Sequence, residues 1–145
     1  DSYINGQNPS GNSVIMRLEF WKTAKALISD NILFGVGTGD GKLEMQIMYD
    51  KTNSVLDQNW RLGSHNEFLS TWVKTGLIGF IIFVIALFSP ILRKENRNFI
   101  YLSFFLIAIL SFLAENTLET QPGVTFFGFF NCWLIFHGFK TSKEN

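Results

Sequence analysis

The stretch TGLIGFIIFVIALFSPIL, residues 75–92, decides the fold, because its eighteen residues include no charged side chain. Two further apolar stretches follow, NFIYLSFFLIAILSFLA at 98–114 and PGVTFFGFFNCWLIFHGF at 122–139. Each approaches the roughly 20 residues that a helix needs to cross a bilayer. Burying three such runs in a chain of 145 residues would need a much larger soluble shell. We therefore predict an all-α integral membrane protein with transmembrane helices at about 75–92, 98–114 and 122–139.

The composition agrees with this prediction and excludes several soluble classes. The chain is 47% hydrophobic and 17% charged, with 16 Phe and a formal net charge of zero, whereas about a quarter of a soluble domain is charged. A nucleic-acid-binding protein would carry a basic excess, so nucleic acid is not an expected partner. His65, Cys132 and His137 are too few for a structural zinc site, and a single cysteine forms no intrachain disulfide.

The positions of the cations predict the orientation in the membrane. Residues 93–97, RKENR, lie between the first two apolar runs, and Lys140 and Lys143 follow the third. The positive-inside rule places both groups in the cytoplasm. Residues 115–121, ENTLETQ, carry two Glu and no cation, which suits the opposite face. We therefore expect residues 1–74 and 115–121 to lie outside the cytoplasm, and residues 93–97 and the C-terminus to be cytoplasmic.

The sequence itself does not explain how residues 1–74 are exported. The chain does not begin with Met and shows no charged, apolar and small-residue segments of a signal peptide. We expect it to be the C-terminal part of a larger multi-span protein, whose other helices deliver this segment to the outer face.

The segment outside the cytoplasm, residues 1–74, is predicted to be mostly helical. After a turn-rich start at 5–12, apolar residues recur at spacings of three and four over 13–30, which predicts an amphipathic helix capped by Ser13. A second, shorter helix is predicted at about 42–56. Alternating glycines between them match neither a phosphate loop nor a dinucleotide fingerprint, and we interpret them as a loop that uses left-handed backbone.

The sequence SHNEFLSTWVKTGLIG, residues 64–79, contains the first candidate for chemistry. Ser64 with Glu67 three residues later is a capping-box pattern, which predicts one helix that begins at His65 and continues into the first span. The positive end of the helix dipole disfavours an imidazolium in the first turn, so a neutral His65 can act as a base. A histidine that only makes hydrogen bonds within the loop is an equally good interpretation.

Four other charged residues are candidates. A guanidinium binds phosphate in a bidentate manner, so Arg17 and Arg61 near His65 would suit an anionic lipid phosphate. A solvated or interfacial arginine is the simpler interpretation of Arg17. Glu115 and Glu119 are four residues apart and would share a helix face as an acid and base pair. A solvated turn, or ion pairs with Arg17 or Arg61, is the interpretation we favour for them.

These motifs resemble the C-terminal part of the O-antigen ligase and O-antigen polymerase superfamily of multi-span membrane glycosyltransferases. Residues 17–39, RLEFWKTAKALISDNILFGVGTG, are similar to the family's Arg-x-x-x-Trp helix and following Gly-x-Gly turn. Residues 65–79, HNEFLSTWVKTGLIG, resemble its His-Asn motif at the start of a span. Residues 115–127, ENTLETQPGVTFF, resemble the last outer loop in one branch of the family.

The resemblance implies transfer of a glycan from undecaprenyl pyrophosphate at the outer face of the bacterial inner membrane, without a metal or nucleotide cofactor. The acceptor would be a glycan, such as the lipid A-core of lipopolysaccharide, or a protein hydroxyl. Arg17 would hold the donor pyrophosphate. His65 would accept the proton of the acceptor hydroxyl or position that hydroxyl, and Asn66 would orient His65 or the acceptor. Arg61 has no assigned family position. Further essential basic residues of the family lie upstream, so we expect the 145 residues alone to be inactive.

Other functions stay open at this point. A protein O-oligosaccharyltransferase is the alternative within the enzyme class. The chain would otherwise belong to a polysaccharide or lipid transporter, with Arg17 and His65 along its path, or to a purely structural subunit. The predicted spans contain no ionisable residue of the kind that ion-coupled transporters bury except His137, which weakly disfavours the transporter.

Overall fold

The computed structural model describes residues 12–141, with the side chains of residue 95 and of residues 137–141 left aside. The turn-rich start predicted at 5–12, apart from Asn12, and the predicted cytoplasmic Lys143 lie outside the described residues. This part of the chain is all-helical, as the sequence predicts. Its α-helices are α1 (Ser13–Asp30), α2 (Gly41–Lys51), α3 (Glu67–Leu92), α4 (Phe99–Ala114) and α5 (Gln121–Thr141), and its short 3-10 helices are η1 (Gln58–Trp60), η2 (Lys94–Asn96) and η3 (Thr117–Glu119).

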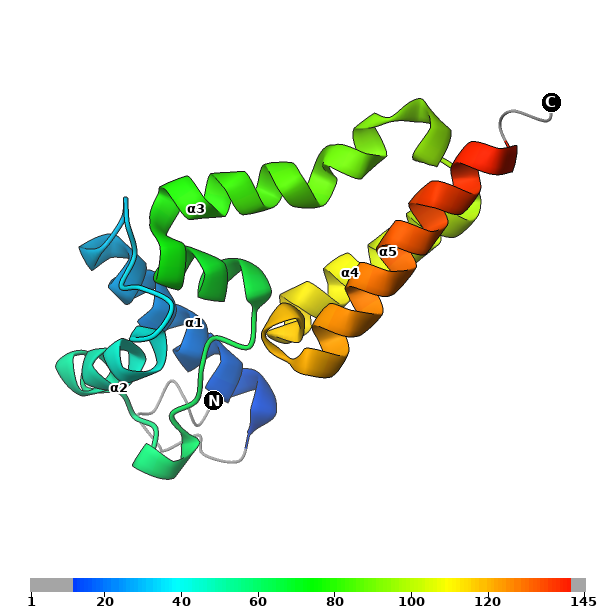
Figure 1. Ribbon diagram of the computed structural model, residues 1–145. Coiled ribbons are helices and arrows are strands. Elements are labelled where there is room, and N and C mark those ends of the chain that lie inside the picture. Colours follow the sequence, from blue (N-terminus) through cyan, green and yellow to red (C-terminus); the bar gives the residue numbers. More distant parts are fainter. Residues whose placement is uncertain (1–11, 142–145) are drawn as a thin grey trace.

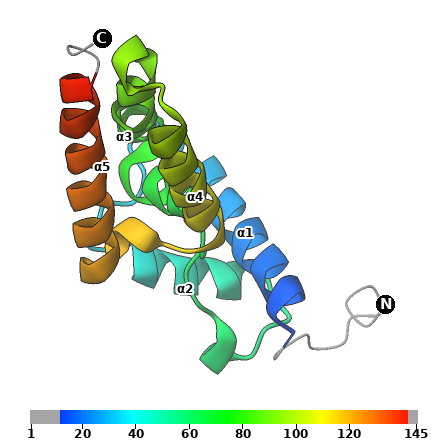
Figure 2. The same ribbon diagram turned by 90° about the vertical axis from the view of Figure 1, so that its right-hand side faces the viewer.

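The helices form two groups, each with its own buried core. In the first group, α1 and α2 pack against the beginning of α3 around the fully buried ring of Tyr49. In the second group, the rest of α3 packs with α4 and α5 around Tyr101 and Phe112. Figures 1 and 2 show α4 and α5 running alongside each other, away from α1 and α2. The helix α3 belongs to both groups and joins them.

Two helix ends differ from the sequence prediction. The cap of α1 is Asn12, whose side-chain oxygen accepts a hydrogen bond from Ile15 N, and not Ser13. The helix α2 ends at Lys51, before the predicted end at residue 56. It stops because Asn53 adopts a left-handed φ of 48°, which an α-helix cannot continue through.

The prediction that one continuous helix begins at His65 is wrong. His65 has a φ of 45°, outside the helical region, so the helix begins at Glu67. Asn66 is the cap, and its Oδ1 accepts a hydrogen bond from Leu69 N at 3.0 Å. The Ser64 hydroxyl donates to the Asn66 carbonyl instead of capping the helix.

The helix α3 is also bent sharply at Gly76, where φ is 66° and ψ is −172°. Two aromatic pairs join the parts on either side of the bend. Trp72 stacks on Phe80 with ring centroids 4.9 Å apart, and Phe68 meets Phe83 edge to face at 5.9 Å. The part before Gly76 therefore folds back against the part that follows, as Figure 1 shows.

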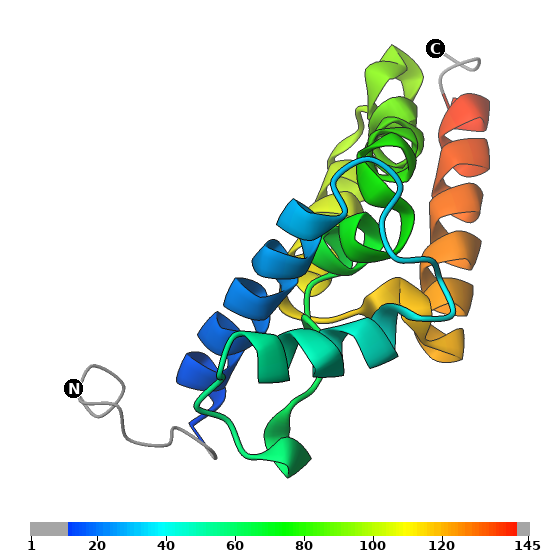
Figure 3. The same cartoon turned by 90° about the vertical axis from the view of Figure 1, so that its left-hand side faces the viewer.

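The connection between α1 and α2 supplies the hydrogen bonds that the bend removes from the helix. Its Val36 N donates to Val73 O at 2.9 Å, and its Ile32 O accepts from Leu77 N at 2.8 Å. Gly37 N donates in the same way to the Lys74 carbonyl at 2.9 Å. Figure 3 shows this connection, in cyan, beside α3. Both ends of the broken helix are thus paired with one loop.

This contact requires glycine on both sides. A Cβ on Gly76 would lie 2.2 Å from the Leu33 carbonyl oxygen, and a Cβ on Gly35 would lie 2.5 Å from the Gly76 nitrogen. Both glycines also have a positive φ, which glycine adopts without steric cost. Gly35 and Gly37 of the loop therefore adopt left-handed backbone, as the sequence predicts, and Gly35 also allows the close approach to α3.

One helix in the described part of the chain, α3, is long and apolar enough to cross a membrane, with a mean hydropathy of 2.5. The helix α4 is a shorter apolar helix of 16 residues. The three-span arrangement therefore stays a prediction.

Tyr49 connects α2 to the segment that leads to His65. Its hydroxyl donates a hydrogen bond to the Leu62 carbonyl at 2.9 Å, and its side chain is fully buried. Burial raises the pKa of Tyr49 above its ordinary value, and the negative charge of Glu19 adds to this, while Arg61 acts in the opposite direction. The neutral phenol is therefore the form that the fold stabilises.

We predict that Gly76→Ala destabilises the protein. The positive φ alone costs an alanine about 1–2 kcal/mol, and the clash with the Leu33 carbonyl adds to this cost. The thermal midpoint of the detergent-solubilised full-length protein should fall by several degrees. Gly39→Ala is the matched control, because a Cβ there meets nothing within 4 Å. Equal midpoints for the two variants would show that the contact at Gly76 is not required.

We also predict an alkaline loss of stability that depends on Tyr49. Because its pKa is raised in the fold, the Tyr49 contribution to stability is present below the ordinary tyrosine pKa of about 10 and is lost as the pH rises above it. Tyr49→Phe should cost about 1 kcal/mol near neutral pH, through loss of the hydrogen bond to Leu62. Above about pH 10, the thermal midpoint of Tyr49→Phe should fall less than that of the unsubstituted protein. An unchanged fall would mean that other groups cause the alkaline loss.

Candidate functional site

Glu115 is the centre of the candidate site, because its carboxylate joins two side chains from distant parts of the sequence. It lies at the C-terminal end of α4, where Oε1 accepts a hydrogen bond from Arg17 Nη2 of α1 at 2.9 Å. Its other oxygen, Oε2, lies 2.6 Å from His65 Nδ1. Arg17 and His65 are 98 and 50 residues from Glu115 in the chain. The fold thus brings three of the sequence candidates into direct contact.

The helix α1 holds His65 in place. The φ of 45° is in the left-handed region that residues other than glycine rarely occupy, and such a conformation costs of order 1–3 kcal/mol. The imidazole ring stacks on Phe20, with centroids 5.5 Å apart. Next to it, the Ser64 carbonyl accepts a hydrogen bond from Trp21 Nε1 at 3.0 Å. These contacts fix both the backbone and the ring of His65.

The contact with Glu115 decides which nitrogen of His65 can act as a base. Beside an ionised Glu115, a neutral imidazole carries its proton on Nδ1 and donates it to Oε2. The lone pair is then on Nε2, which can accept a proton from another molecule. The Glu115 charge would stabilise the imidazolium that results. This arrangement is able to perform general base catalysis.

Asn66 has a positioning role in the structure. Its Nδ2 donates to the Leu113 carbonyl of α4 at 3.2 Å, and its backbone N donates to Asn116 Oδ1 at 2.8 Å. It also caps α3 through Leu69 N. Asn66 is the residue after His65 and is 7% exposed, and these contacts anchor the backbone next to His65 to the end of α4 that carries Glu115.

Arg61 contacts side chains of α2 and the backbone of its own loop. Its Nη1 is paired with Asp50, its Nε donates to the Leu56 carbonyl at 3.0 Å, and its guanidinium lies over the Tyr49 ring at 5.9 Å. Only 12% of its side chain is exposed, against 38% for Arg17. These contacts favour a structural role for Arg61 and leave Arg17 the more accessible of the two guanidinium groups.

Glu119 belongs to a second polar group near Glu115. Its Oε2 lies 2.7 Å from Lys74 Nζ, and its Oε1 accepts a hydrogen bond from the Ser70 hydroxyl. The buried Glu67 accepts a hydrogen bond from Leu118 N at 2.8 Å, which fixes the η3 turn that carries Glu119. Glu115 and Glu119 therefore have different partners and do not form the acid and base pair considered from their spacing.

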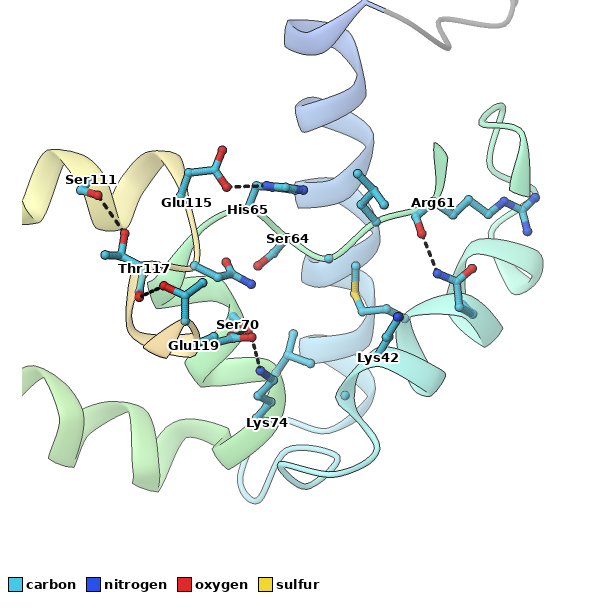
Figure 4. A pocket seen from close by; sticks show the side chains of 18 residues that line it. Lys42, Arg61, Ser64, His65, Ser70, Lys74, Ser111, Glu115, Thr117 and Glu119 are labelled. Carbon is cyan, nitrogen blue, oxygen red and sulfur yellow. Dashed lines mark hydrogen bonds and ion pairs between the residues drawn. The ribbon is translucent and has the colours of Figure 1, made fainter. Parts of the chain in front are cut away.

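His65 and Glu115, together with the polar group around Glu119, line one cavity of about 790 Å³, whereas Arg17 is not part of its lining. The cavity lies between α2, residues 61–65, the first part of α3, the end of α4 and the η3 region. Its volume is within the roughly 300–1,000 Å³ typical of ligand sites. Figure 4 shows His65 turned toward Glu115 and Lys74 turned toward Glu119. The charged side chains of the lining are those of Lys42, Arg61, His65, Lys74, Glu115 and Glu119.

Sequence reasoning did not single out Lys42, Ser70 or Lys74 as site residues. Ser70 and Lys74 are four residues apart on the first part of α3, so both can face the same side. That spacing is visible in the sequence, but their partner Glu119 is 49 residues from Ser70. Lys42 enters from α2, and the sequence contains no pattern that relates it to the others.

Comparison with known proteins identifies the family. Residues 3–84, more than half of the chain, match the family described as O-antigen ligase. The matched region contains Arg17, Arg61, His65 and Asn66 but ends before Glu115.

An uncharacterized protein of Haemophilus influenzae is 33% identical to the chain over 91 residues, which is 62% of this chain. The aligned part is 22% of the relative, so the chain spans about a fifth of its length. No solved structure is significantly similar to the chain. The family match covers α1 with Arg17, α2, the segment before α3 that carries His65, and most of α3. The chain therefore belongs to the O-antigen ligase family.

Proposed function

We propose that the protein containing this chain is a membrane glycosyltransferase of the O-antigen ligase or polymerase type. It transfers a glycan from undecaprenyl pyrophosphate to an acceptor hydroxyl at the outer face of the bacterial inner membrane. Family membership supports the general reaction class. The contact of Glu115 with both His65 and Arg17, beside a cavity of ligand size, is the observation that carries the specific proposal.

The proposed reaction uses His65 as the base. The acceptor hydroxyl gives its proton to His65 Nε2, and its oxygen forms a bond to the anomeric carbon of the donor glycan. The bond between that carbon and the pyrophosphate oxygen breaks, and undecaprenyl pyrophosphate leaves with the electron pair. Glu115 keeps the proton of the imidazole on Nδ1 and stabilises the positive charge that His65 acquires. No metal or nucleotide takes part in this proposed step.

Arg17 is the proposed partner of the donor pyrophosphate. A guanidinium has five N–H donors, and the contact of Arg17 with Glu115 uses one nitrogen, Nη2. The remaining donors can bind phosphate oxygens and stabilise the charge that develops on the leaving group. Asn66 orients His65, while Arg61 and Glu119 support the cavity wall. In this proposal Arg17 binds the leaving group, His65 is the base, and Glu115 contacts both side chains.

The proposed membrane placement uses three spans, namely α3 after its bend, α4 and α5. The cationic turn at 93–97 then lies in the cytoplasm. Glu115, His65 and Arg17 lie at the opposite, periplasmic end, where a lipid-linked donor would present its pyrophosphate. The apolar length of α3 supports this placement, and α4 is a shorter apolar helix of 16 residues.

Cysteine labelling in cells tests this topology. Gln58→Cys in the full-length protein should react with a membrane-impermeant maleimide once the outer membrane is permeabilised, because η1 is expected in the periplasm. Lys94→Cys should react only after the inner membrane is opened. Both positions are exposed in the structure, so burial would not explain a lack of reaction. Labelling of Lys94→Cys in intact cells would reverse the proposed orientation.

The catalytic proposal predicts that His65→Ala abolishes glycan transfer at normal protein level. Loss of a general base typically lowers a rate by about 10²–10⁴-fold, which should remove the polymer ladder from a surface-glycan gel. Glu115→Gln, which keeps the shape but removes the charge, should lower transfer by a smaller factor. Glu44→Gln is the control, because Glu44 is on α2 but does not line the cavity.

The form of the gel also distinguishes the acceptors. Loss of all polymer from lipid A-core indicates a ligase, and collapse to a single repeat indicates a polymerase. Unchanged lipopolysaccharide with loss of glycan from a protein indicates a protein O-oligosaccharyltransferase. If His65→Ala leaves every glycan unchanged at equal expression, His65 is structural and the catalytic proposal fails.

A further inference from the structure

The connection between α1 and α2 presents an exposed apolar tip. Residues 31–39, NILFGVGTG, contain no charged side chain. At the tip, Ile32, Leu33 and Phe34 are 50%, 54% and 76% exposed. Three consecutive large apolar side chains at this exposure form a surface that water does not favour. This tip, Ile32–Leu33–Phe34, therefore needs a partner that the described chain does not supply.

Two backbone carbonyls of the tip, those of Ile32 and Leu33, accept hydrogen bonds from α3, while its side chains are exposed. The Ile32 carbonyl accepts hydrogen bonds from Leu77 N at 2.8 Å and from Trp72 Nε1 at 3.3 Å. Gly35 N donates to the Asn31 carbonyl at 3.1 Å. Backbone groups can enter the apolar region of a bilayer only when they are paired inside the protein. The tip meets this condition at these groups through its contact with the bend of α3.

The tip lies where the apolar part of α3 begins. Its hydrogen bonds reach Leu77, the first residue after the Gly76 bend. From there, exposed apolar side chains continue along the helix at Ile78, Ile81, Ile82 and Ile85. Trp72 stacks on Phe80 at the same level, and tryptophan is enriched at membrane interfaces. The tip thus lies beside the first of the exposed apolar side chains of α3.

We propose that the Ile32–Leu33–Phe34 tip inserts into the outer leaflet of the membrane, with lipid acyl chains as its partner. Asp30, the charged residue that precedes the tip, agrees with this placement, because it is paired with Lys51 of α2. The inserted tip fixes the position of α1, α2 and the cavity relative to the bilayer. The inference rests on the proposed membrane insertion of α3, but not on glycosyl transfer.

Fluorescence quenching in vesicles tests the proposal. The full-length protein, with Cys132 and any other cysteine replaced by serine, would carry one environment-sensitive fluorophore at Phe34→Cys. It would be reconstituted into vesicles of phosphatidylethanolamine and phosphatidylglycerol. Lipids with a nitroxide near the top of the acyl chain report contact with lipid, and iodide reports contact with water. Gln58→Cys on η1 is the aqueous control, and Ile82→Cys on α3 is the control for membrane insertion.

We expect the nitroxide lipid to remove most of the Phe34→Cys fluorescence and iodide to have little effect, with the reverse at Gln58→Cys. Quenching of Phe34→Cys by iodide would place the tip in water and overturn the inference. Quenching by neither agent would show that another part of the protein covers the tip, which also overturns it. If iodide quenches Ile82→Cys as well, the proposed membrane insertion of α3 fails together with the inference.

Discussion

Backbone hydrogen bonds between the α1–α2 connection and the bend at Gly76 hold the two groups of helices in their relative positions. A helix that breaks leaves carbonyl and N–H groups without partners, and such groups are costly when they are removed from water. Here the loop supplies both a donor to Val73 and an acceptor for Leu77. The close approach requires glycine at positions 35 and 76, since a Cβ at either would overlap the opposite backbone. One contact therefore fixes the direction in which α3 continues and the position of α1 beside it.

The candidate site depends on this arrangement. Because α3 folds back at Gly76, Ser70 and Lys74 lie along the cavity wall rather than in line with the apolar part of the helix. Because α1 is fixed beside the bend, its Arg17 reaches Glu115 at the end of α4. Glu115 then connects the first group of helices to the second through Arg17 and His65. The catalytic proposal and the membrane-insertion proposal thus both depend on the contact at Gly76. This contact places the first part of α3 along the cavity, and it also holds the Ile32–Leu33–Phe34 tip beside the apolar part of α3.

The sequence predicts much of the fold and part of the site. Apolar spacing indicated the helix at 13–30, and the uncharged runs indicated the apolar helices after residue 75. The predicted start of α3 at His65 was wrong. Ser64 and Glu67 fit a capping box, but Asn66, a cap residue of equal quality, lies between them and caps the helix instead. The competition was decided by contacts of Ser64 and His65 with α1, which local spacing does not contain. The ion pair of Glu115 with Arg17 was among the interpretations favoured from the sequence, but the simultaneous contact of Glu115 with His65 was not predicted.

The sequence by itself determined the helical class, the apolar segments, the family resemblance and the residue types available for chemistry, because periodicity, composition and motifs are local properties of the chain. Only the tertiary structure decided which of these residues meet. The Glu115 contacts span 98 and 50 residues, and the bend at Gly76 is stabilised by a loop some forty residues earlier in the chain. Such contacts depend on the path of the whole backbone, since a carboxylate pairs with whichever cation the packing of the helices brings within hydrogen-bonding distance.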